Sequence, residues 1–147
     1  FASKADLLQR AMDVAVVGDD APVPVAERPG FAALGVGPRA ARIAAAARVV
    51  VDIQRRTVGF AKVLREAAPA DESIAATLRA TRERQRSDVA AGVALVVGRP
   101  PTDAERDAVW ALVSVEVYLL LVEESGWTPE QYEAWLTELL DATVPHE

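Results

Sequence analysis

The side chains best suited to binding chemistry are polar residues at positions where helical periodicity predicts the protein interior. Gln54 and Thr57 fall on the inward stripe of one long helix. Arg82 (or Thr81) and Gln85 fall on the equivalent stripe of the next. A polar group in a core needs a partner, which is another side chain, water or a ligand. For any single residue a local interaction is the simpler interpretation, but the set indicates that at least two contact a ligand.

Aromatic residues supply the apolar walls that such a pocket needs. Trp110 and Tyr118 are eight residues apart, about two helical turns, so they share one face of a helix. Phe31 and Phe60 come from other segments. The alternative is that all four are ordinary core residues. With the polar set, they predict a pocket for a small, hydrophobic or aromatic effector.

Several classes of chemistry are excluded by composition. The chain has no cysteine, and its single histidine, His146, is the penultimate residue. Thiolate sites are therefore absent, and a histidine triad or metal site is not expected. No Glu-x-x-His pair occurs, and no carboxylate cluster faces inward by its spacing. We expect no enzyme activity, no metal and no cofactor.

The elements that position these residues are predicted to be helices. Alanine, leucine and valine dominate, aromatic residues make up 5%, and no segment has the alternation of a strand. Capping signals at Ser3, Asp71 or Ser73, Thr102 or Asp103, and Thr128, with breaks at Gly18, Pro69, Gly98 and Pro145, predict five main helices. Their expected ranges are 3–16, 39–67, 72–97, 102–125 and 129–144, with a short helix near 31–34 in the connector.

The fourth predicted helix is apolar nearly all round, which is typical of a helix covered on opposite sides. We predict that one face packs on its own core and another on a second subunit, joined by the last helix in a four-helix bundle across a two-fold axis. The alternative is a monomer with this helix at its centre. The predicted interface residues are Val109, Leu112, Val113, Val117, Leu120, Trp135, Leu136, Leu139 and Leu140.

Charge is divided unevenly along the chain. The net charge is −6, but residues 1–100 carry a net charge of +4 and residues 101–147 a net charge of −10. We expect the acidic side chains to lie at the rim of the dimer interface, because buried like charges would oppose association. The chain as a whole does not have the basic character of a nucleic-acid binder, so any contact with DNA belongs near its start.

Two segments resemble a known family of regulators. The first eight residues, Phe-Ala-Ser-Lys-Ala-Asp-Leu-Leu, are similar to the junction between the recognition helix and the fourth helix of TetR-family repressors. Residues 110–118 and 126–136, which include Gly-Trp-Thr-Pro-Glu-Gln-Tyr, resemble the last two helices of actinobacterial-type members. The connector at 22–31 fits the same subgroup, so the resemblance covers nearly the whole chain.

The resemblance implies a fold, a partner and a mechanism. The fold would be a TetR C-terminal-domain-like bundle spanning residues 1–147, which dimerises through its last two long helices. Residues 1–16 would link it to a helix-turn-helix domain that is not among these residues and that binds operator DNA. Lys4 would sit where the family often contacts a phosphate, and a plain solvated lysine is the alternative.

The expected function is therefore a cytoplasmic transcriptional regulator, in most cases a repressor, whose effector shifts the linking helix. No signal peptide is expected, and the longest apolar run, 109–122, is too short to cross a bilayer. The alternative is a ligand-free helical dimerisation or adaptor protein. A thermal-shift screen with apolar compounds separates the two.

Overall fold

The fold is all-α. The computed structural model describes residues 3–19 and 23–146, and these contain no strand. The longer helices are α1 (Lys4–Val17), α3 (Arg39–Ala67), α4 (Glu72–Val97), α5 (Asp103–Leu112) and α7 (Pro129–Thr143). The shorter elements are η1 (Val25–Glu27), α2 (Pro29–Ala32), η2 (Ala33–Gly35), η3 (Ala68–Ala70), α6 (Val115–Tyr118) and the π-helical segment η4 (Leu119–Glu124).

The helices begin at the capping residues that the sequence indicates. Ser3 accepts a hydrogen bond from the amide of Asp6, and Asp71 accepts from the amides of the first turn of α4. Thr102 and Thr128 both form complete capping boxes. Each of these side chains satisfies an amide that the helix leaves open. The positions of these starts are therefore confirmed.

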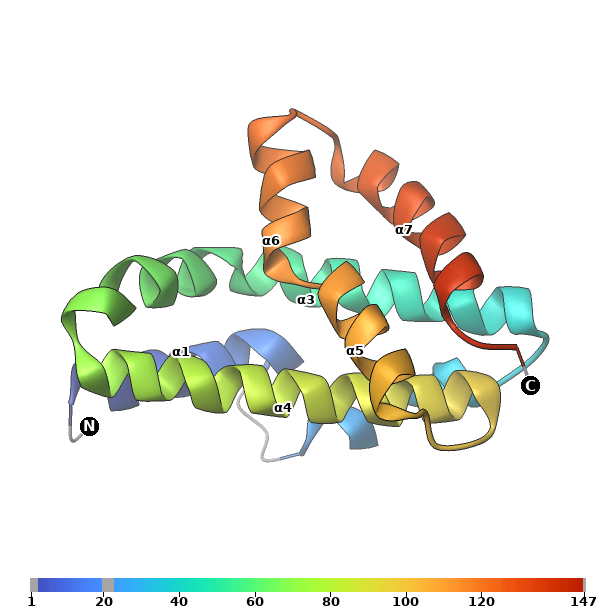
Figure 1. The fold of residues 1–147 in the computed structure, drawn as a ribbon, viewed down its shortest axis with the longest axis horizontal. Coiled ribbons are helices and arrows are strands. Elements are labelled where there is room, and N and C mark those ends of the chain that lie inside the picture. Colours follow the sequence, from blue (N-terminus) through green and yellow to red (C-terminus); the bar gives the residue numbers. More distant parts are fainter. Residues whose placement is uncertain (1–2, 20–22, 147) are drawn as a thin grey trace.

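Two long helices form the frame of the molecule. Figure 1 shows α3 and α4 running side by side and joined by the short η3, with α1 lying along them. On the other side, α5 leads away from the end of α4, α6 and η4 rise from α3, and α7 returns to it. Helix α1 and the last two helices thus occupy different sides of the α3–α4 pair.

The core has two parts. The larger lies where α3 and α4 meet α5, α6 and α7, around Ile43, Val93 and Leu136. The smaller holds α1 against the far ends of α3 and α4, through Met12 and Leu64. The seam between α1 and the rest of the molecule is therefore separate from the main core.

The helix expected at 102–125 is not continuous, and that prediction was wrong. It ends at Leu112, turns through Val113 and Ser114, and resumes as α6 and η4. Ser114 has an extended backbone, and valine stands on both sides of it. Serine competes for backbone hydrogen bonds, and β-branched valine loses side-chain freedom in a helix. Both residue types therefore weaken the helix at this point. The break changes the direction of the chain between α5 and α6 (Figure 1).

Many acidic residues of the C-terminal part form ion pairs with basic residues of the same chain. Basic residues of α3 and α4 form ion pairs with acidic residues of α5, α6, η4 and α7. These pairs are Arg39–Asp141, Arg48–Glu133, Lys62–Glu123, Arg65–Glu116, Arg82–Glu116 and Arg86–Asp107. The uneven distribution therefore joins the two halves of the fold, and much of the acidic charge is balanced without a partner subunit.

Candidate functional site

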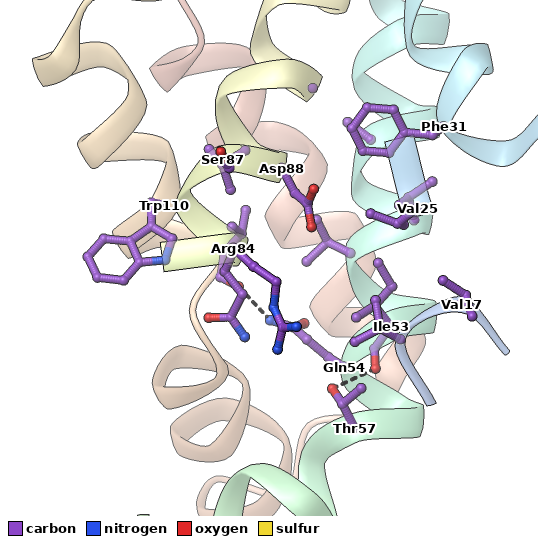
Figure 2. A pocket seen from close by; sticks show the side chains of 18 of the residues that line it. Val17, Val25, Phe31, Ile53, Gln54, Thr57, Arg84, Ser87, Asp88 and Trp110 are labelled. Carbon is purple, nitrogen blue, oxygen red and sulfur yellow. Dashed lines mark hydrogen bonds between the residues drawn. The ribbon is translucent and has the colours of Figure 1, made fainter. Parts of the chain in front are cut away.

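A cavity of about 990 Å³ lies between α1, α3, α4 and α5. Its volume is at the upper end of the range for sites that hold drug-sized molecules. Residues of the connector, among them Val25 and Phe31, and the start of α6 complete the wall. Figure 2 shows α3 carrying Ile53, Gln54 and Thr57 opposite α4 with Arg84 and Asp88.

Most of the wall is aliphatic because three helices turn their apolar stripes toward the same space. The aliphatic lining comes from Met12, Val16 and Val17 of α1, Ala46, Val49, Val50 and Ile53 of α3, and Val89, Val93 and Val96 of α4. Valine and alanine fill less volume than leucine or phenylalanine would. Because these side chains are small, they leave the cavity open, whereas larger side chains at the same positions would fill it.

Gly92 of α4 lets the connector approach the cavity. A Cβ at this position would lie 3.3 Å from Cδ2 of Leu34 and 3.5 Å from Cζ of Phe31. Both of these side chains are buried, and both line the cavity. The glycine therefore seats the connector against α4 and fixes one end of the site.

Gln54 connects the cavity wall to the junction between α5 and α6. Its side chain is only 5% exposed, and Nε2 donates to the carbonyl oxygens of Val113 at 2.8 Å and Ser114 at 3.3 Å. These carbonyls stand at the break where helical bonding is lost. The Gln54 amide therefore satisfies acceptors that the interrupted helix leaves open.

The side chain of Gln54 also lies close to a buried phenol, that of Tyr132. Neither Oε1 of Gln54 nor the hydroxyl of Tyr132 has a hydrogen-bond partner among the described residues. Burial raises the pKa of Tyr132 to about 12, and Gln54 acts in the opposite direction. The phenol is thus neutral at physiological pH.

Asp88 brings a carboxylate to an otherwise apolar part of the wall. In Figure 2 its side chain extends from α4 into the space below Phe31 and beside Val25. Burial raises the pKa of Asp88, and the charge of Arg84, one turn earlier, lowers it. The raised pKa shows that the desolvation of this carboxylate outweighs the neighbouring charge.

The other charged residues of the wall are paired. Arg84 forms an ion pair with Asp13 of α1 at 3.3 Å. Asp19, just after α1, pairs with Arg28 at 2.7 Å. These contacts connect α1 and its end to α4 and to the connector.

Five of the eight residues that the sequence predicts in a pocket line this cavity: Phe31, Gln54, Thr57, Gln85 and Trp110. Gln54 and Thr57 are engaged within the chain, because the hydroxyl of Thr57 donates to the carbonyl of Ile53 at 2.8 Å. That any of them contacts an effector stays a prediction.

The other three residues lie elsewhere, which corrects their assignment. Phe60 packs on the small core that holds α1. Arg82 forms an ion pair with Glu116 at 3.4 Å, beside a minor hollow of about 40 Å³, whereas Thr81, the alternative at this place on the stripe, is buried and lines the cavity. Tyr118 is sealed in the main core, edge-on to the ring of Tyr132 at 5.2 Å between centroids. The break before α6 separates Tyr118 from Trp110, so the face they were expected to share does not exist.

Asp88 and the whole contribution of α1 were not predicted from the sequence. A signal for Asp88 was present, since Gln85, Asp88 and Gly92 are spaced three and four residues apart and so share a helix face. No comparable signal marked α1, because its placement depends on contacts distant in sequence.

The residues expected at a subunit interface fall into two groups. Val109, Leu136 and Leu140 are 5%, 0% and 2% exposed, so they belong to the core of this chain and cannot contact a partner. This part of the prediction was wrong, because α7 packs on α3, α5 packs on α4, and α5 and α7 contact each other. Leu120 is 54% exposed. The remaining five, Leu112, Val113, Val117, Trp135 and Leu139, are half-buried.

Lys4, expected from the resemblance to contact a DNA phosphate, is exposed in the first turn of α1. Its charge reaches Asp71, whose pKa is lowered mainly by the hydroxyl of Ser73 and only slightly by Lys4. Lys4 is thus open to solvent, and a contact with a DNA phosphate stays a prediction.

The described residues offer neither a metal site nor a membrane span. Within residues 3–19 and 23–146, no group of three or more histidine, aspartate or glutamate side chains could hold a metal ion. No helix in the same part of the chain combines the length and apolarity needed to cross a membrane.

Comparisons with family models, with curated proteins and with solved structures found no match. The described residues form an all-α domain with a large cavity, and helix α1 forms one wall of this cavity.

Proposed function

We propose that this chain is the effector-binding and dimerisation domain of a TetR-type transcriptional regulator. A small, largely apolar effector enters the cavity, and α1 carries the response to a DNA-binding domain outside these residues. The observation that carries the proposal is that α1, the helix expected to lead to that domain, is itself a wall of the cavity, through Met12, Val16 and Val17.

The way α1 is held supports a switch. Arg56 of α3 donates to the last carbonyls of α1, those of Ala15 at 2.8 Å and Val16 at 2.9 Å. Asp13 pairs with Arg84 of α4, and both residues line the cavity. These exposed polar contacts and the small core around Met12 are weaker attachments than the main core. An occupant that prefers one position of α1 therefore has little to overcome.

In this proposal the chain acts as a homodimer through the outer side of α6, η4 and α7. The support is apolar surface on these elements that this chain leaves uncovered: Leu120 of η4 is exposed, and Val117 of α6 and Trp135 of α7 are half-buried. Moving α1 in both subunits changes the spacing of the two DNA-binding domains relative to half-sites about one DNA turn apart.

A thermal-shift screen with small apolar and aromatic compounds tests the proposal. A ligand at 100 times its Kd stabilises the folded state by about 2.7 kcal/mol, which raises Tm by several degrees in a domain of this size. Ala46→Phe places a ring in the cavity and should reduce the shift, whereas Ala80→Phe, exposed on α4, should not. If no compound class raises Tm, or if both variants respond like the parent, the cavity is not an effector site.

A further inference from the structure

One charged group in the cavity wall has no partner among the described residues. Arg84 pairs with Asp13, Asp19 with Arg28, and Arg10 with Asp6. No hydrogen bond or ion pair joins Asp88 to any described residue, although it lines the cavity and is half-buried.

This placement removes the carboxylate of Asp88 partly from water, and the nearby charge of Arg84 offsets only part of that cost. A carboxylate removed from water without a partner is unfavourable, and burial here raises its pKa. In Figure 2 the side chain of Asp88 extends toward the part of the wall formed by Val25 and Phe31. Arg84 lies one turn away but extends to Asp13 of α1 instead. A perturbed carboxylate in a cavity, with no structural task, points to a ligand.

The chemistry of the wall selects the charge of that ligand. Three of the charged residues lining the cavity are acidic, Asp13, Asp19 and Asp88, and two are basic, Arg10 and Arg84. An anion would meet an unpaired carboxylate and two arginines that already have acidic partners. A cation would supply Asp88 with the partner it lacks, and its hydrocarbon part would meet valine, alanine and phenylalanine.

We propose that the cavity binds an amphiphilic amine, a cation with an apolar or aromatic tail, and that Asp88 is its counter-ion. The ammonium group donates to the carboxylate of Asp88, and the tail extends along the aliphatic faces of α3 and α4. The inference rests on the proposed effector site and names the class of its ligand. Because Asp13 and Arg84 pair nearby, the same site places the charged end of the ligand close to α1.

The test compares three phenylhexyl compounds that share one tail: the amine, the alcohol and the carboxylate. Binding to the full chain is measured by isothermal titration calorimetry at neutral pH and 150 mM salt, which screens attraction to the acidic surface. The variant Asp88→Asn removes the charge with little change in shape. Glu83→Gln, an exposed residue of the same helix, is the matched control for loss of one acidic charge.

The amine is expected to bind at least tenfold more tightly than the alcohol or the carboxylate. Asp88→Asn should remove that preference while binding of the alcohol changes less than twofold, and Glu83→Gln should keep it. If the alcohol or the carboxylate binds as well as the amine, or if Asp88→Asn retains the preference, the inference is overturned and the effector site survives. If none of the three binds, the inference is overturned, and the effector site fails with it only when the thermal-shift screen also finds no compound class that raises Tm.

Discussion

The side-chain amide of Gln54 donates to the backbone carbonyl of Val113 at 2.8 Å, one residue beyond the end of α5. A buried glutamine on the central helix thus holds the point at which the chain turns from α5 into α6. Because Gln54 and Val113 both line the cavity, the same contact shapes the site.

Replacing this glutamine with leucine should destabilise the fold. Gln54→Leu keeps the volume but removes the donor to Val113 and Ser114, and an unsatisfied buried acceptor costs about 1–3 kcal/mol. The measurement is the free energy of unfolding in urea. Gln85→Leu makes the same change at an exposed residue of the cavity wall and should alter stability by less than about 0.5 kcal/mol. Equal effects of the two substitutions would show that the Gln54 bonds contribute nothing.

Two glycines in long helices should respond oppositely to alanine. Gly59 is exposed in α3, and a Cβ added there would meet no atom within 4 Å, so Gly59→Ala should stabilise the protein by about 0.5–1 kcal/mol through helix propensity. At Gly92 the new methyl would meet Leu34 at 3.3 Å, and the buried connector must shift. Gly92→Ala should therefore gain less than Gly59→Ala or lose stability. Thermal unfolding of both variants decides this, and an equal gain would mean that the connector does not pack closely on α4.

The capping box of α5 should give a defined pH dependence. Arg99 and the amide of Thr102 lower the pKa of Glu105 from 4.5 to about 2. A lowered folded-state pKa contributes stability above pH 4.5, and this contribution is lost as the pH falls toward 2. Glu105→Gln should therefore be less stable than the parent at neutral pH, with a difference that shrinks below pH 4.5. A difference that stays constant down to pH 2 would contradict the pairing with Arg99.

The proposed dimer makes a prediction at Leu120. Glutamate there would place a charge in the apolar interface, so Leu120→Glu should convert the dimer to monomers of 15.7 kDa in light scattering. Val36→Glu makes the same change at a more exposed valine in the connector and should leave the dimer intact. A parent chain that is monomeric at micromolar concentration would remove the dimer from the proposal.

Local signals determined most of the helices. The caps at Ser3, Thr102 and Thr128 and the breaks at Gly18 and Gly98 each act over a few residues, so the sequence alone locates the elements they bound. The break at Ser114 was missed because no proline or glycine marks it. It depends on Gln54, which is about sixty positions earlier and supplies the donors that the open carbonyls need.

The site was only partly predictable for the same reason. Helical spacing placed Gln54, Thr57 and Gln85 on inward stripes, and all three line the cavity. Spacing cannot say which inward residues will find a partner within the chain. Because the chain changes direction between α5 and α6, Glu116 forms an ion pair with Arg82. For the same reason the ring of Tyr118 packs against Tyr132. The contribution of α1 depends on tertiary packing that no local pattern encodes.

The central claim is that an occupant of the cavity moves α1, and the distance between two spin labels tests it most directly. The chain has no cysteine, so Leu7→Cys on α1 and Val63→Cys on α3, both at exposed positions, give two unique labels. Labelled protein is diluted into unlabelled protein so that only distances within one chain are read. With saturating phenylhexylamine, or any ligand from the thermal-shift screen, the account predicts a shift in the distance distribution that Ala46→Phe abolishes. An unchanged distribution while calorimetry shows the ligand bound would contradict it.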